Sequence, residues 1–391
     1  MFHILSPLRG VLKSSATSVR IDNTVFRLHY RVTVTGLVAA SLLITARQYF
    51  GEPINCLEKE GIPPTVLDTY CWLHGTYSSE AAWRKAVGRE VAYPGVDRGD
   101  RRGFEGEGQT SSSRTYHGYY QWVWAVLALQ ALFFYLPHYL WKSLEGGLTR
   151  NLTLDLGKAI LKEEEKAEQL HLLTEYLHRA KRMGLHRRLP TGYLICELLN
   201  CLNVVLQAVA IDQVLGGRFL GYGLAVLQNS MSSTLSSSPS SWPMAYDPML
   251  RVFPRVSKCE YFQFGSSGEV ESLDTICLLP VNIFNEKVFL LLWYWLLMLA
   301  VLSVASLLYT LITAIILPAF RIALHRLTIY RGEDEKKVVD GQFCSTGFGI
   351  GDTFVLALLE KNLNPLHYHD LLICLEEEKE CNAELCKEKV V

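Results

Sequence analysis

The sequence predicts an all-α polytopic membrane protein with four transmembrane helices, two disulfide-linked extracellular loops and a helical cytosolic dome. Three observations lead to this fold class. The 391 residues are 49% hydrophobic and 20% charged, and the apolar residues are concentrated in a few long runs. Basic residues flank these runs on one side of the expected membrane. Four of the ten cysteines fall, two and two, in the connections on the other side.

Four segments are long and apolar enough to cross a bilayer, which takes about 20 residues of helix. These expected spans are residues 32–50, 119–141, 191–212 and 288–318. The first contains Arg47 and Gln48, whose polar ends must reach the interface by snorkelling. The second carries aromatic residues at both ends, as an interfacial belt requires, and Pro137 should kink its far end.

Positive charge predicts the orientation, because basic flanks stay in the cytosol. Lysine and arginine are dense in the arm 1–31, at the end of the connection 142–190 and at the start of the tail 319–391. The connections 51–118 and 213–287 have no comparable basic flank. Both termini and the middle connection are therefore expected in the cytosol, and the two long connections outside the cell.

The cysteines agree with this topology, although they were not used to derive it. Cys56 and Cys71 fall in the first outer loop, and Cys259 and Cys277 fall in the second. An even number of cysteines on the oxidising side favours disulfides. Four cysteines allow three pairings, and their spacing does not choose among them.

Other function classes find little support. No span or loop collects a nucleophile, base or metal set, so we expect no enzyme, no cofactor and no metal site. The glycines of 347–351 lack a framing strand and helix, and the histidines of 367–370 fit no standard zinc spacing. A net charge of −1 gives no reason to expect a nucleic-acid partner.

Several short motifs match one family. The second span begins with the pentapeptide Tyr119, Tyr120, Gln121, Trp122 and Val123. The first outer loop contains the tripeptide YCW at 70–72. The second contains FPRVSKC at 253–259 and CLLPVNIFNEK at 277–287. Together these motifs resemble those of the innexins, the invertebrate gap-junction channel subunits, and the similarity runs nearly end to end.

The resemblance implies a channel subunit of the plasma membrane. Innexins form hemichannels and intercellular gap junctions through which ions and small molecules pass passively. The implied partners are copies of this chain or other innexins, typically eight to a ring, together with membrane lipids and a docked hemichannel of the apposed cell. The outer loops carry no N-x-S/T sequon, which leaves their surface free to meet another protein.

Two other functions remain open. One is a large-pore channel that stays undocked, as pannexins do. The other is a four-pass junctional adhesion or scaffold protein like claudins or tetraspanins, although their outer-loop cysteine signatures are absent. The resemblance also implies cross-loop disulfides, Cys56 with Cys277 and Cys71 with Cys259, with pairing inside each loop as the alternative.

Two further sets of residues are candidate functional residues. Apolar residues three and four apart in 1–17 indicate an amphipathic helix. In innexins this arm narrows the pore mouth, so Phe2, His3 and Ser6 are candidate pore-lining residues; the alternative is a helix in the headgroup plane. The third span carries an intramembrane polar stripe, Glu197, Asn200, Asn203 and Gln207. Because lipid exposure of this stripe would be costly, it should make interhelical hydrogen bonds or face the permeation path.

The remaining segments divide into helices and flexible loops. Leucines at helical spacing predict a cytosolic helix in 162–181, and the pattern continues at 354–361 and 367–378. The polar stretches 98–114 and 229–241 are expected to be flexible loops.

Overall fold

A computed structural model describes most of the chain. The described residues are 19–57, 62–97, 114–153, 156, 162–235, 247–312 and 349–377. The chain divides into two compact units. The helical unit consists of residues 1–30, 135–201 and 302–391, and the sheet unit consists of residues 31–134 and 202–301. Several long helices contribute residues to both units.

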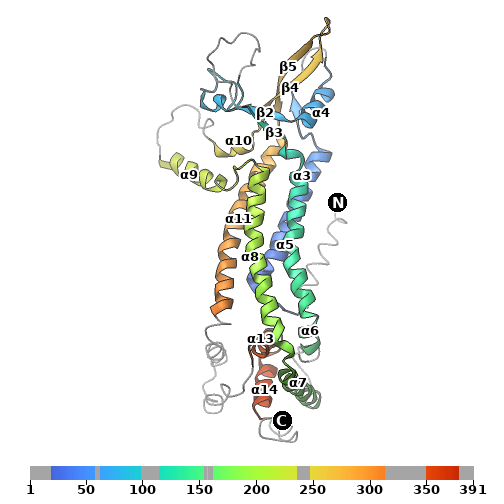
Figure 1. The fold of residues 1–391 in the computed structure, drawn as a ribbon. Coiled ribbons are helices and arrows are strands. Elements are labelled where there is room, and N and C mark those ends of the chain that lie inside the picture. Colours follow the sequence, from blue (N-terminus) through green and yellow to red (C-terminus); the bar gives the residue numbers. More distant parts are fainter. Residues whose placement is uncertain are drawn as a thin grey trace. The chain divides into compact units, whose positions relative to one another are not determined.

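Four long helical segments are present among the described residues (Figure 1). They are Thr24–Phe50, composed of α2 (Thr24–Arg27), η2 (Leu28–Thr33) and α3 (Val34–Phe50); α5 (Val123–Glu145); Leu185–Val214, composed of η5 (Leu185–Arg187) and α8 (Arg188–Val214); and α11 (Pro280–Leu311). Each is long and apolar enough to cross a membrane. The predicted four-span, mostly helical fold is therefore confirmed.

The helix ends differ from those that hydropathy predicts. The first helix begins at Thr24 rather than at residue 32, because the Asn23 side chain caps its first turn. The fourth begins at Pro280 rather than at 288, with proline at the first helical position, where its missing N–H costs nothing. The second begins at Val123, after the 3₁₀ turn η4 (Tyr119–Gln121). The expected end of the fourth span at 318 lies outside the described residues.

The two long connections fold together into one five-stranded antiparallel sheet, which the sequence analysis did not predict. Its strands are β1 (Asn55–Cys56), β2 (Thr76–Ser79), β3 (Arg114–His117), β4 (Val256–Phe264) and β5 (Val270–Leu278). The spatial order is β1-β5-β4-β2-β3. The β4–β5 hairpin of the second connection therefore lies between two strands of the first.

The hairpin is longer than its neighbours. β4 and β5 pair along their whole length, from Val256 opposite Leu278 to Phe264 opposite Val270. β2 joins β4 only at Lys258, and β1 joins only the last two residues of β5. The far half of the hairpin consequently forms a two-stranded ribbon that extends past the other strands (Figure 1).

Short helices complete the sheet unit. They are α4 (Pro64–His74), η3 (Ala81–Arg84), α9 (Tyr222–Leu235) and α10 (Pro248–Val252). The stretch 229–241 was expected to be a loop, but its first part is the end of α9. Of the other expected loop, 98–114, only Arg114 is described, and it begins β3.

The helical unit contains helices at the stretches where leucine spacing predicted them, namely α7 (Glu163–Met183), α13 (Ile350–Glu360) and α14 (Pro365–Glu377). It also contains α6 (Leu148–Thr153), which was not predicted. Leu170, Leu173 and Leu177, which gave α7 its helical spacing, pack against Leu359 of α13 and Leu371 of α14 in one buried cluster. The apolar stripe of α7 is thus satisfied within the unit.

Candidate functional site

Two disulfides join the two connections in the sheet unit. Cys56 of β1 is bonded to Cys277 of β5, its direct partner across the strands. Cys71 of α4 is bonded to Cys259 of β4, with 5.8 Å between their Cα atoms. These are the cross-loop pairs that the family resemblance implies, and the alternative of pairing inside each loop is wrong.

The disulfides are shielded from solvent. All four cysteines are buried, and each bond links residues about two hundred positions apart, 221 for one and 188 for the other. Closing such long loops removes much freedom from the unfolded chain. The sulfur atoms of Cys56, Cys71 and Cys277 lie within 4.8 Å of one another. Because all three are in disulfides, they offer no thiolate to a metal ion.

The family-signature pentapeptide holds the first connection against the start of α5. The Gln121 side-chain amide donates to the Trp72 carbonyl oxygen. The Tyr120 ring is fully buried and packs on the Trp72 ring, with 4.8 Å between the centroids. Trp72 is also part of the YCW motif that contains the disulfide-bonded Cys71. Two motifs that are far apart in the sequence therefore form one contact.

The same pentapeptide contacts the second connection. The Tyr119 hydroxyl donates to the carbonyl oxygen of Val252 over 3.2 Å, and its ring meets the edge of Phe253 at 5.7 Å between centroids. Val123 is buried, whereas Trp122 is exposed. The turn before α5 is thus a junction for both connections, which accounts physically for four of the five signature residues.

An ion pair between a partly exposed arginine and a buried glutamate joins the second connection to the start of α11. The Arg255 guanidinium lies 2.7 Å and 3.0 Å from the two carboxylate oxygens of Glu286, which is fully buried. The Asn282 amide donates to the Pro254 carbonyl oxygen over 2.7 Å. A buried carboxylate needs such partners to remain charged. The FPRVSKC and CLLPVNIFNEK motifs therefore fix how β4 follows from α10 and how α11 begins.

Charged groups cover part of the sheet near the base of the hairpin. Lys258 pairs with Asp274 at 2.9 Å, and Arg114 pairs with Glu260 at 3.0 Å. The Tyr77 hydroxyl donates to Asp274 over 3.2 Å. Burial, together with the charge of Asp274, raises the pKa of Tyr77. These bonds tie β2, β3, β4 and β5 to one another.

One face of the hairpin end carries apolar side chains. Phe262, Phe264 and Val270 are 45%, 79% and 63% exposed. Alternate residues of a strand share a face, and Phe264 lies opposite Val270 across the strands. The three side chains therefore form one exposed apolar surface, which we call the hairpin tip.

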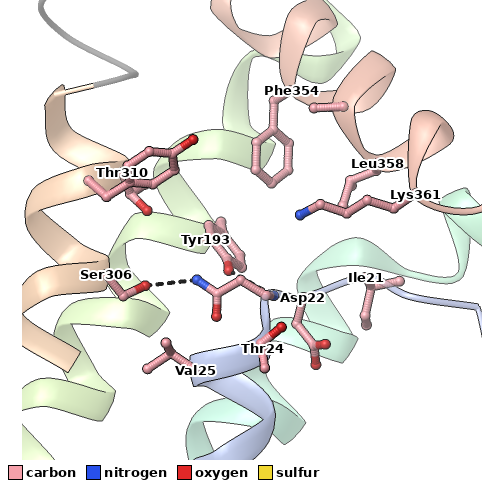
Figure 2. A pocket seen from close by; sticks show the side chains of 13 residues that line it. Ile21, Asp22, Thr24, Val25, Tyr193, Ser306, Thr310, Phe354, Leu358 and Lys361 are labelled. Carbon is pink, nitrogen blue, oxygen red and sulfur yellow. Dashed lines mark hydrogen bonds between the residues drawn. The ribbon is translucent and has the colours of Figure 1, made fainter. Parts of the chain in front are cut away.

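In the helical unit, Asn23 connects three helices. Its side-chain oxygen accepts from the Phe26 amide over 2.6 Å and caps α2. Its side-chain nitrogen donates to Glu197 of α8 over 2.7 Å and to Ser306 of α11 over 2.8 Å. The bond to Ser306 is drawn as a dashed line in Figure 2. A pocket of about 340 Å³ lies beside these groups, lined by residues of α2, α8, α11 and α13.

The polar stripe of the third span is largely buried. Glu197 and Asn200 are buried in the helical unit, and Gln207 is buried in the sheet unit, whereas Asn203 is half-buried. The Gln207 amide donates to Asn203 over 3.1 Å, and the Gln130 amide of α5 donates to the Gln207 carbonyl oxygen over 3.4 Å. The stripe thus takes part in hydrogen bonds between helices at Glu197 and at Gln207.

Some functional residues escaped the sequence analysis. Asp22 is buried, 3.1 Å from Arg27 and 3.7 Å from His138. Arg255 was quoted there only as part of a motif, and Asn23 was not singled out. The sequence shows each of these three residues as polar or charged. It does not identify the residue with which each one pairs. The pore-lining candidates Phe2, His3 and Ser6 lie outside the described residues.

Comparisons with known proteins agree with the motifs. The sequence model of the Innexin family matches residues 22–378. The chain is 40% identical to innexin inx2 of Schistocerca americana, over 97% of this chain and 99% of that protein. It is 39% identical to innexin inx2 of Drosophila melanogaster, over 97% and 96% of the two chains. It is 37% identical to Drosophila innexin shaking-B, over 95% and 93%.

Proposed function

Because this chain belongs to the innexin family and is therefore a gap-junction channel subunit of the membrane, we propose that it docks through its sheet unit with a ring in the apposed cell. Innexins assemble as oligomers with other innexins, and a ring of eight subunits is part of this proposal. The observation that carries it is the disulfide-braced sheet with an exposed apolar hairpin tip.

The sheet unit is proposed to face outward. Its four cysteines are oxidised, which suits the extracellular side, where disulfides persist. The basic flanks at the other ends of the spans favour the cytosol for both termini and for residues 142–190. On this orientation, the arm with Phe2, His3 and Ser6 enters the pore from the cytosolic side, where we propose that it lines the channel.

Docking is assigned to the hairpin tip for two reasons. Exposed apolar side chains gathered on one face mark a surface that another protein covers. The ribbon also has two free backbone edges. Within the described sheet, the outer edge of β4 beyond Lys258 toward the turn and the outer edge of β5 beyond Cys277 toward the turn have no neighbouring strand. Such edges are available for pairing with another chain. The partner that fits is the same tip on an apposed ring, since a two-fold contact uses one surface twice.

The test is electrical coupling between paired cells. Phe264→Ser combined with Val270→Ser should lower junctional conductance about tenfold or more, the effect of losing an apolar anchor at an interface. Single-cell current and surface expression should not change. Leu73→Ser is the matched control, because Leu73 is 68% exposed in the same unit but lies away from the tip.

Three outcomes would contradict the proposal. Unchanged junctional conductance in the double variant would exclude the tip as the docking surface. If the wild-type protein gives current in single cells but no coupling between paired cells, this would favour a channel that does not dock. Neither current nor coupling would favour an adhesion or scaffold protein.

A further inference from the structure

A small polar cavity lies inside the helical unit, among residues of the first, third and fourth long helices. Its polar lining consists of His29 of η2, Glu197 and Asn200 of α8, and Ser303 and Ser306 of α11. Val25 and Phe26 complete the wall. The volume is about 10 Å³, which is about the room that one water molecule or one small ion requires.

Two oxygen atoms of the lining residues lack a hydrogen-bond donor. The Glu197 carboxyl group is only 5% exposed, and its first oxygen accepts from Asn23 and Ser306. The Thr310 and Tyr193 side chains also interact with the carboxyl group, whereas no donor is in hydrogen-bond geometry with its second oxygen among the described residues. Asn200 is 3% exposed, and its side-chain oxygen likewise has no donor there. Because the two residues are three positions apart on α8, they share one face of the helix.

The charge of the lining is unbalanced. Glu197 is the only acidic residue among the seven that line the cavity, and no lysine or arginine lines it. His29 is the only basic residue, and its Nε2 lies 2.8 Å from the Ser303 hydroxyl oxygen. A carboxylate inside a membrane-spanning helix is costly unless a cation or a proton neutralises it.

We propose that this cavity binds a single Na⁺ ion. The ligands are the second carboxylate oxygen of Glu197, the side-chain oxygen of Asn200 and the hydroxyl oxygens of Ser303 and Ser306. Carboxylate, amide and hydroxyl oxygens are the hard donors that alkali and alkaline-earth cations prefer. The inference goes beyond the docking function and concerns the other unit of the chain.

The donor set favours a monovalent ion over a divalent one. A single carboxylate balances one positive charge, so Na⁺ leaves the cavity neutral, whereas Ca²⁺ would leave a buried excess of charge. Ca²⁺ also takes six to eight oxygen ligands, more than this lining offers. A water molecule could donate to both free oxygens but would not neutralise Glu197. Bound Na⁺ links α8 to α11 at the level where Asn23 joins both helices.

The experiment measures ion binding by the full-length protein in lipid nanodiscs. Radioactive ²²Na⁺ should bind saturably, at one ion per subunit, in a choline chloride background of constant ionic strength. Glu197→Gln removes the negative charge and Asn200→Leu removes a ligand oxygen, so each should weaken binding about tenfold or more. The matched control is Asn203→Leu, which changes an amide on the same helix that does not line the cavity and should bind normally.

Folding is checked separately by oligomer size and by thermal unfolding. Na⁺ should raise the melting temperature of the wild type relative to the same concentration of choline, and this shift should disappear in Glu197→Gln. The absence of saturable ²²Na⁺ binding by folded wild-type protein would overturn the proposal. Retention of binding in both folded ligand variants would also overturn it, as would equal stabilisation by choline. None of these readouts depends on docking.

Discussion

At the scale of single residues, His117 shows how burial sets a pH limit on the sheet unit. Its ring is buried and lies 2.8 Å from the Ser78 hydroxyl oxygen, between β3 and β2. Burial, reinforced by the nearby charge of Arg218, lowers the pKa of His117 to about 4. The unfolded chain, with a pKa near 6.5 for this group, binds the proton more readily between these two values. Stability is therefore complete above pH 6.5 and is lost as the pH falls toward 4.

The corresponding prediction concerns His117→Gln. The wild type should lose about 3 kcal/mol of unfolding free energy between pH 6.5 and 4 through this residue. Glutamine does not titrate, so the variant should lack this part of the pH dependence while keeping a hydrogen bond to Ser78. Thermal unfolding of both proteins across this range measures the difference. Parallel stability curves would show that His117 does not titrate as described.

At the scale of elements, the joint between β4 and α11 depends on one charged pair. Glu286 is fully buried, and Arg255 is 2.7 Å away. Lys287 also lies 3.2 Å from Glu286, but it is largely exposed. Removing Arg255 would leave the buried Glu286 charge with only the exposed Lys287 as a counter-charge, which costs more than removing both members of the pair.

We therefore predict that Arg255→Met lowers the unfolding free energy by about 3 kcal/mol. The double variant Arg255→Met with Glu286→Met should recover most of this loss, because no buried charge remains. Arg255→Lys should fall between the wild type and the single variant, since lysine cannot form the two-pronged contact. Denaturant unfolding of the wild type, Arg255→Met, Glu286→Met and the double variant gives the coupling free energy, and additive effects would contradict the prediction.

The helices and the sheet differ in how far the sequence predicts them. An apolar run of about 20 residues identifies a span by itself, so the sequence predicts all four spans. The first turns of the helices that begin at Thr24 and Pro280 contain polar residues, so hydropathy does not predict where these helices begin. β1 and β2 have two and four residues, too few for an alternation pattern. β1 pairs with β5 of the other connection, and β2 pairs with β3 of its own connection and with β4 of the other. Pairings across such distances are set by tertiary structure, which local patterns do not encode.

The candidate site was predicted in a similarly uneven way. Charge and cysteine placement identified the four disulfide-bonded residues, but only the family resemblance supplied their pairing. The burial of Glu197 followed from its place in a polar stripe. Its partner Asn23 did not, because the two residues are 174 positions apart and meet only when the helices pack.

At the scale of the whole molecule, the orientation proposed above makes a direct prediction. An epitope inserted between Ser240 and Ser241 should be reached by antibody on intact cells expressing the protein. The same epitope at the C-terminus should be reached only after permeabilisation, because the basic flanks keep that end in the cytosol. Staining of the inserted epitope only after permeabilisation would invert the topology and remove the basis for docking.

The position of the β4–β5 hairpin in the sheet also has a consequence for biosynthesis. Within the described sheet, β1 has β5 as its only neighbour, and β5 and β4 together separate β1 from β2. Three of the five strands are thus translated long before the two that complete the sheet, and Cys56 and Cys71 emerge as thiols before their native partners are made. Until the ribosome has passed Cys277, the first connection must be kept from mispairing, so on the proposed orientation the maturation of this protein is decided late, in the oxidising lumen.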